Sequence, residues 1–133
     1  MPKYGTESTQ ILKRADTRLQ YIFNELIHHY DVKLLCSYRD KAGQDKAFFV
    51  DHTSKLVWPH SKHNVLPSLA VDVVPWFVAE PHIRYKDKTA FAYMAGHIMM
   101  IAANADIKVR WGADFDMDTI LDDWDWGHFE LVT

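Results

Sequence analysis

The clearest pattern along the chain is a set of apolar residues spaced three and four positions apart over residues 11–30. This is the spacing of one face of an α-helix, and Ser8 or Thr9 just before it is a suitable N-cap. A second set with the same spacing covers residues 87–105, and a weaker one covers 41–50. The sequence therefore predicts three helices, two of them long.

Short apolar runs between these helices have the length and composition of strands. They cover residues 32–36, 69–74, 107–111 and 128–132. Residues 51–67 and 76–85 have no clear period and are predicted loops, and long loops inside compact domains often carry function. Helices that alternate with short strands predict an α+β fold, in which flanking helices pack on a small, mainly antiparallel sheet.

The composition is that of one folded domain over residues 1–133. Apolar residues make up 48% of the chain and aromatic residues 14%, which excludes a disordered protein. No run approaches the ~20 apolar residues that a membrane-spanning helix needs. The single Cys36 excludes an internal disulfide, and a net charge of −3 argues against a dedicated nucleic-acid-binding protein.

Eight histidines are unusual for this length, and two of them lie at the end of a predicted loop or the start of a predicted strand. Asp72 interrupts the apolar run of residues 69–74, where an unpaired carboxylate is costly. His63 precedes that run, and His128 begins the last predicted strand. A catalytic zinc needs three ligands of this kind and an open position for water, so these three residues are candidate ligands. On spacing alone, a cluster held only by hydrogen bonds remains the alternative.

The segments around these residues resemble the signature of the zinc D,D-peptidase-like family. Ser-x-His, Ala-x-Asp and an acidic residue before a His-Phe-Glu-Leu strand are matched by Ser61-x-His63, Ala70-x-Asp72 and Asp125-x-x-His128-Phe129-Glu130-Leu131. Ser37-Tyr38-Arg39 with Gln44 resembles the family's Gly-x-Arg turn, and Arg110-Trp111-Gly112-Ala113-Asp114-Phe115 resembles its Arg-Trp-Gly-Gly-Asp-Trp segment. The family includes D-alanyl-D-alanine carboxypeptidases and phage L-alanyl-D-glutamate endolysins.

The resemblance implies a hedgehog/D,D-peptidase-like fold and a zinc metallopeptidase that cuts peptidoglycan stem peptides. It implies that His63, Asp72 and His128 hold Zn²⁺, which would activate water for attack on a peptide carbonyl. It also implies that Asp125 is the base that takes the proton of this water. Because dipeptidases of the family typically have Glu at this position, Asp125 favours the endolysin branch.

Two further residues receive roles from the resemblance. Arg39 would stabilise the developing oxyanion or bind a substrate carboxylate. Ser61 would bind the substrate peptide or orient the ligand loop. His63 and Asp72 are nine positions apart, two more than in the commoner form of the motif, and this variant resembles phage-encoded members.

The implied activity is hydrolysis of the L-alanyl-D-glutamate bond during bacterial cell lysis by a bacteriophage. Two alternatives stay open: a D-alanyl-D-alanine carboxypeptidase, and a non-catalytic cell-wall-binding or virion morphogenesis protein that keeps zinc for folding. The expected partner is the peptidoglycan stem peptide, with no nucleic acid and no membrane insertion, and the chain is expected to be a monomer. Because no signal-peptide pattern opens the sequence, we expect it in the host cytoplasm, from which a holin-type partner would give access to the cell wall.

The acidic segment before His128 has a second interpretation, as a calcium loop. Positions 1, 3, 5 and 12 of an EF-hand count are occupied by Asp114, Asp116, Asp118 and Asp125, which makes Ca²⁺ a candidate ligand. Thr119 stands where such a loop needs glycine, and Asp125 already has a role. A solvated acidic loop is therefore the alternative to a calcium site.

Other aromatic and imidazole side chains have weaker claims on function. His60 precedes the Ser-x-His motif and is a candidate for the rim of the site. Trp124 and Trp126 flank Asp125, so at least one is expected to shield the site from water. The remaining histidines are expected to be structural or exposed: His28, His29, His52, His82 and His97.

Overall fold

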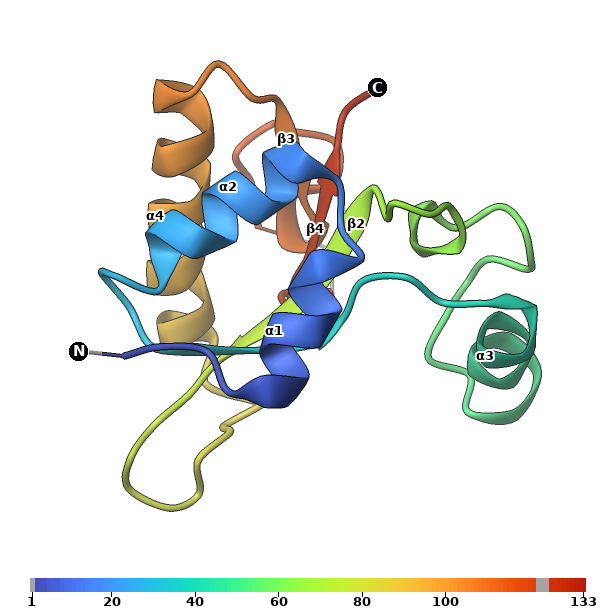
Figure 1. Ribbon diagram of the computed structural model, residues 1–133, viewed down its shortest axis with the longest axis horizontal. Coiled ribbons are helices and arrows are strands. Elements are labelled where there is room, and N and C mark those ends of the chain that lie inside the picture. Colours follow the sequence, from blue (N-terminus) through green and yellow to red (C-terminus); the bar gives the residue numbers. More distant parts are fainter. Residues whose placement is uncertain (1, 122–124) are drawn as a thin grey trace.

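Four short strands form one antiparallel sheet in the order β1-β2-β4-β3 (Figure 1). Their bounds are Val32–Cys36 for β1, Ala70–Pro75 for β2, Val109–Trp111 for β3 and His128–Leu131 for β4. The last strand in the sequence lies between β2 and β3, so it is hydrogen-bonded on both sides. This computed structural model describes residues 2–121 and 125–133, and the predicted role of Trp124 lies outside the described residues.

The two faces of the sheet differ because side chains alternate along a strand. One face is apolar and at most 1% exposed at Val71, Val73, Phe129 and Leu131. The residues between them, Asp72, His128 and Glu130, therefore point to the opposite face. The alternation that builds the core thus gathers polar side chains on the other side of the same strands.

Three α-helices pack against the apolar face of the sheet, and together they form one hydrophobic core. They are α1 (Thr6–Lys13), α2 (Thr17–Leu26) and α4 (Lys88–Asn104), and Figure 1 shows α2 beside α4. The predicted helix over residues 87–105 is confirmed, with Asp87 as its N-cap. Together with the antiparallel sheet, these helices confirm the predicted α+β fold.

The prediction of one continuous helix over residues 11–30 is wrong, because the chain leaves the helix at Asp16. The backbone N–H of Asp16 donates to the carbonyl oxygen of Ser68 at 2.8 Å. The Asp16 carboxylate accepts a hydrogen bond from the backbone N–H of Arg18 at 2.9 Å and so caps α2. The predicted N-cap of the first helix is also wrong, because α1 begins after Gly5 and both Ser8 and Thr9 lie inside it.

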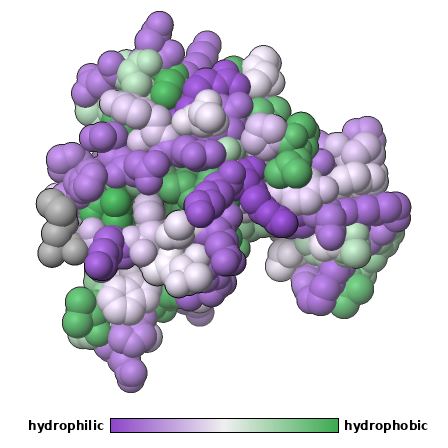
Figure 2. All heavy atoms as spheres, in the orientation of Figure 1, coloured by the Kyte–Doolittle hydropathy of each residue, from purple (hydrophilic) through white to green (hydrophobic). Residues whose placement is uncertain are grey.

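The remaining segment forms a lobe beside the sheet (right-hand side of Figure 1). It contains α3 (Lys41–Asp45), the π-helical turn η1 (Lys46–Val50) and a long loop with the 3₁₀ turn η2 (Lys62–Asn64). The predicted helix over residues 41–50 is confirmed, although residues 46–50 form a π-helical turn and not an α-helical one. Figure 2 shows the lobe standing out from the body, with polar side chains over most of this face. No helix within the described residues is long and apolar enough to cross a membrane.

Candidate metal centre

Asp72 and His128 face each other across the sheet. They are partners in the antiparallel register of β2 and β4, which places directly opposed Cβ atoms about 4.5–5.5 Å apart. Oδ1 of Asp72 lies 3.0 Å from Nδ1 of His128. The strand pairing therefore brings together two predicted ligands that are 56 positions apart in the sequence.

His63 reaches the same carboxylate from outside the sheet. It lies in η2, whose N-cap is Ser61, and the Ser61 hydroxyl accepts a hydrogen bond from the backbone N–H of His63 at 3.2 Å. The ring Nε2 is 3.2 Å from Oδ1 of Asp72, and Nδ1 is 2.6 Å from the carbonyl oxygen of Ser37. Two imidazoles thus converge on one carboxylate oxygen, and Ser61 orients the turn that carries one of them.

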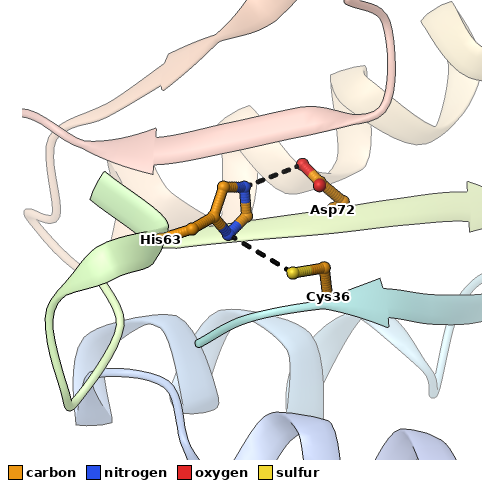
Figure 3. A group of neighbouring side chains, drawn as sticks. All are labelled: Cys36, His63 and Asp72. Carbon is orange, nitrogen blue, oxygen red and sulfur yellow. Dashed lines mark hydrogen bonds and ion pairs between the residues drawn. The ribbon is translucent and has the colours of Figure 1, made fainter. Parts of the chain in front are cut away.

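Cys36 lies on the other side of the His63 ring from Asp72 (Figure 3). Its Sγ is 3.8 Å from Nδ1 of His63. Among the described residues, Cys36, His63 and Asp72 each offer a ligand atom within 4.8 Å of the others, so this group could bind a metal ion. The sequence prediction did not include Cys36, and its position immediately before the Ser37-Tyr38-Arg39 turn was the available signal.

Carboxylates hold both imidazoles in the protonated form. Burial disfavours the charged ring of His63, but the charge of Asp72 outweighs burial and raises its pKa to about 10. Burial also opposes protonation of His128, whose hydrogen bonds to Asp72 and Glu130 raise its pKa to about 9. Burial alone would raise the pKa of Asp72, yet the His63 charge and the His128 hydrogen bond lower it well below its usual range.

Glu130 is a buried carboxylate that the sequence prediction did not assign to the site. Its side chain is 8% exposed, and Oε1 lies 2.8 Å from Nε2 of His128. Its other oxygen, Oε2, is 3.3 Å from Nζ of Lys62 and 3.7 Å from a guanidinium nitrogen of Arg110. Because residues two apart on a strand share a face, the predicted strand 128–132 already contained this signal. Glu130 therefore fixes the His128 ring from the side away from Asp72.

Arg39 is positioned by Gln44, which is fully buried. Oε1 of Gln44 accepts hydrogen bonds from Arg39 at 3.0 Å and from the side chain of Asn64 at 3.1 Å. The Gln44 amide donates to the carbonyl oxygen of Leu56 at 2.6 Å. A guanidinium nitrogen of Arg39 lies 3.7 Å from Oδ2 of Asp72. One buried amide thus connects Arg39, the η2 turn and the loop before it.

Asp125 lies next to this cluster, just before β4. Burial and the negative charge of Asp72 raise the pKa of its carboxyl, which brings it closer to the range where a carboxylate exchanges protons with water at neutral pH. Gly112 begins the 3₁₀ turn η3 (Gly112–Asp114), and a Cβ on it would overlap the carbonyl oxygen of Asp125. The glycine of the Arg-Trp-Gly segment is therefore required by the backbone of Asp125.

The structure brings all six predicted site residues into the wall of one groove of about 520 Å³. They are Arg39, Ser61, His63, Asp72, Asp125 and His128. His60 lines the same groove, as expected for a residue at its rim. A groove of this size suits a peptide-sized ligand, and its polar groups converge at Asp72.

The acidic segment forms a second cluster beside this groove, whose wall includes Phe115. Asp114, Asp116 and Asp118 place carboxylate oxygens within 4.8 Å of one another. Thr119 has a φ of 69°, the conformation for which calcium loops normally use glycine at this position. Asp125, the fourth acid of the count, lines the groove instead. A calcium site stays a prediction.

Comparisons with known proteins agree with these features. The family model described as "Phage L-alanyl-D-glutamate peptidase" matches residues 2–132. No curated protein matches the sequence significantly. Among solved structures, the L-Ala D-Glu endopeptidase ChiX of Serratia marcescens superposes with a TM-score of 0.76 at 21% identity, covering 97% of this chain and 89% of that chain. That likeness confirms the predicted fold, and the family match confirms the prediction of a peptidoglycan peptidase. The chain belongs to the phage L-alanyl-D-glutamate peptidase family.

Proposed function

We propose that residues 1–133 form a zinc endopeptidase domain that hydrolyses the L-alanyl-D-glutamate bond of peptidoglycan stem peptides. The proposed metal ligands are His63, Asp72 and His128. One observation carries this assignment: Nε2 of His63 and Nδ1 of His128 both lie within 3.2 Å of Oδ1 of Asp72. Two imidazoles and one carboxylate form a donor set typical of catalytic zinc, which needs three protein ligands and one open position.

The remaining nitrogens of the two rings support this choice of ligand atoms. Nδ1 of His63 bonds the carbonyl oxygen of Ser37, and Nε2 of His128 bonds Glu130. Metal-ligating histidines commonly donate their second N–H to such an acceptor, which fixes the ring and its tautomer. Cys36 lies beside the nitrogen of His63 that is already bonded to Ser37, so we leave it out of the proposed ligand set.

Zinc bound by these residues would polarise the scissile carbonyl and lower the pKa of the attacking water. Asp125 accepts a proton from that water and delivers it to the amine that leaves when the C–N bond breaks. Arg39 donates hydrogen bonds to the oxyanion or to a substrate carboxylate, from a position fixed by Gln44. Ser61 holds the η2 turn and, at the groove wall, is placed to contact the peptide.

The setting of this activity is part of the same proposal. The protein would act on the bacterial cell wall as a monomer during phage lysis, after a holin-type partner permeabilises the membrane. Until then it would accumulate in the host cytoplasm. A D-alanyl-D-alanine carboxypeptidase remains the second enzymatic candidate, since it would use the same donor set on a terminal bond.

Mass spectrometry of digested peptidoglycan tests the proposal. Zinc-loaded protein should separate L-Ala from D-Glu in purified sacculi, lose this activity with a chelator and regain it with added zinc. Release of free D-Ala would instead assign a carboxypeptidase, and release of no product would assign a binding protein. His128→Ala should lose zinc affinity, whereas Cys36→Ser, the matched control, should keep both zinc and activity.

A further inference from the structure

The groove that contains the proposed metal ligands continues on both sides of these ligands. A second groove, of about 850 Å³, adjoins the first one at four shared residues: Arg39, Thr53, Asp72 and Asp125. The first groove extends from these residues past Ser61 and His60, whereas the second extends past Tyr85 and Lys86. Asp72 and Asp125 therefore lie between two open halves. A peptide chain bound there can extend away from the scissile bond in both directions.

The second half carries positive charge beyond the residues that it shares. Lys86 and Lys88 line it together with the aromatic rings of Tyr85, Phe91 and Trp126. Nζ of Lys88 lies 5.3 Å from the ring centre of Trp126, within the range of a cation–π contact. Within residues 2–121 and 125–133, no carboxylate other than the shared Asp72 and Asp125 lines this half.

The two ammonium groups are available for a ligand. Asp87 stands between them in the sequence, but its carboxylate accepts the backbone N–H of Ala90 at 3.0 Å and caps α4. Neither lysine forms an ion pair with any residue of the described chain. The first half is lined by two lysines as well, Lys55 and Lys62. It differs in that Lys62 is paired with Glu130 at 3.3 Å and bonds the carbonyl oxygen of Leu131.

Stem peptides have a matching asymmetry of charge. On the amino side of the L-alanyl-D-glutamate bond, L-Ala is joined by an amide to the sugar and carries no charge. On the carboxyl side, D-Glu is linked through its γ-carboxyl, so its α-carboxylate stays free. Where the next residue is diaminopimelate, its far end carries one more carboxylate together with an ammonium group. The free carboxylates of the substrate thus lie in the leaving part.

We infer that Lys86 and Lys88 bind the carboxylates of the leaving part, so that the sugar-proximal part lies along Ser61 and His60. This inference rests on the proposed function and assigns the direction of the substrate in the groove. Exposed ion pairs of this kind contribute modestly to binding. Because they hold the substrate equally in the ground state and in the transition state, their loss should change KM far more than kcat.

Kinetics with two soluble muropeptides test the direction. One carries D-Glu with its free α-carboxylate, and the other carries the same residue amidated to D-isoglutamine. For zinc-loaded wild type, KM should be lower for the acidic peptide. In Lys86→Gln/Lys88→Gln, KM for the acidic peptide should rise about 3- to 20-fold and the preference should disappear, with kcat within about two-fold.

A matched variant separates local from overall charge. Lys3→Gln/Lys13→Gln removes the same charge from exposed lysines outside both grooves and should leave KM unchanged. An equal rise of KM in both double variants, or a wild-type KM in Lys86→Gln/Lys88→Gln, would overturn the inference.

Binding of the product tests the subsite without catalysis. By calorimetry, D-Glu-γ-diaminopimelate should bind wild type more tightly than Lys86→Gln/Lys88→Gln, by the same factor as the change in KM. If wild type cleaves nothing, the proposed function fails, while this titration still decides whether the lysines bind the anionic peptide. Equal affinities in the two proteins would overturn the subsite even if cleavage is normal.

Discussion

Glu130 accepts a hydrogen bond from Nε2 of His128 at 2.8 Å, although the two residues are only two positions apart on β4. Their side chains lie on one face of the strand, and Glu130 is held in turn by Lys62 and Arg110. This arrangement fixes the His128 ring with Nδ1 directed at Asp72. The buried carboxylate is therefore a positioning group for a proposed metal ligand rather than a ligand itself.

Replacing Glu130 should weaken zinc binding. Removal of such an outer hydrogen-bond partner typically costs about 10- to 100-fold in metal affinity, so we expect this loss in Glu130→Ala. Glu130→Gln keeps an acceptor oxygen for His128 and should lose less. Competition with a chromophoric chelator measures the affinity. Glu80→Gln, at a side chain 86% exposed, is the control, and wild-type affinity in Glu130→Ala would rule out the positioning role.

Zinc binding should release protons. The pKa values of about 10 for His63 and about 9 for His128 mean that both rings are protonated at pH 7, and an imidazole must lose this proton to bind a metal. We expect about two protons released per zinc at pH 7, and a zinc affinity that rises as pH increases toward 9. Calorimetry in two buffers of different ionisation enthalpy measures the protons. Release of no proton would show that the rings are already neutral.

The stability of the zinc-free protein should have the opposite pH dependence. Both histidines have a folded-state pKa above the ordinary value of 6.5, so their stabilising contribution is complete below about pH 6.5. It is lost as pH rises through 9 and 10, because the rings give up the protons that face Asp72. Urea denaturation in a chelator should therefore show a falling free energy of unfolding over this interval. His63→Ala should remove part of that dependence.

Much of this site follows from strand periodicity. Once residues 69–74 and 128–132 are identified as strands, alternation places Asp72 and His128 on the face away from the core, and the motif joins them to His63. Nothing local in the sequence gives the contact of Asp16 with Ser68, which divides the first helix, because the two residues are 52 positions apart. The position of Cys36 beside His63 likewise depends on the contact of the η2 turn with the end of β1.

Asp125→Ala should abolish most activity and leave the metal in place. General acid–base groups typically contribute about 10²- to 10⁴-fold in rate, and Asp125 is not among the proposed ligands. Cleavage of muropeptides by zinc-loaded protein measures the loss, and metal analysis shows whether zinc is retained. Asp118→Ala, in the neighbouring acidic cluster, is a matched control. It should cleave muropeptides at the wild-type rate when zinc is the only metal ion present. A fully active Asp125→Ala would remove this residue from the mechanism.

Alanine substitutions at Gly112 and Gly96 should change the free energy of unfolding in opposite directions. A Cβ at Gly112 would overlap the carbonyl oxygen of Asp125, so Gly112→Ala must push the Asp125 backbone out of place. Because small displacements of a reacting group can cost about 10²-fold in rate, we expect a loss of kcat of this order with zinc affinity retained. Overpacking should also lower the free energy of unfolding by about 1–3 kcal/mol.

Gly96 lies on the exposed side of α4, and a Cβ there would meet nothing within 4 Å. Alanine is favoured over glycine inside a helix, so Gly96→Ala should raise the free energy of unfolding by up to about 1 kcal/mol and leave activity unchanged. Urea denaturation and muropeptide cleavage of the two variants give both quantities. Normal kcat in Gly112→Ala would mean that the Asp125 backbone can move aside without disturbing its carboxylate, which would contradict the role of Gly112 in holding the proposed base.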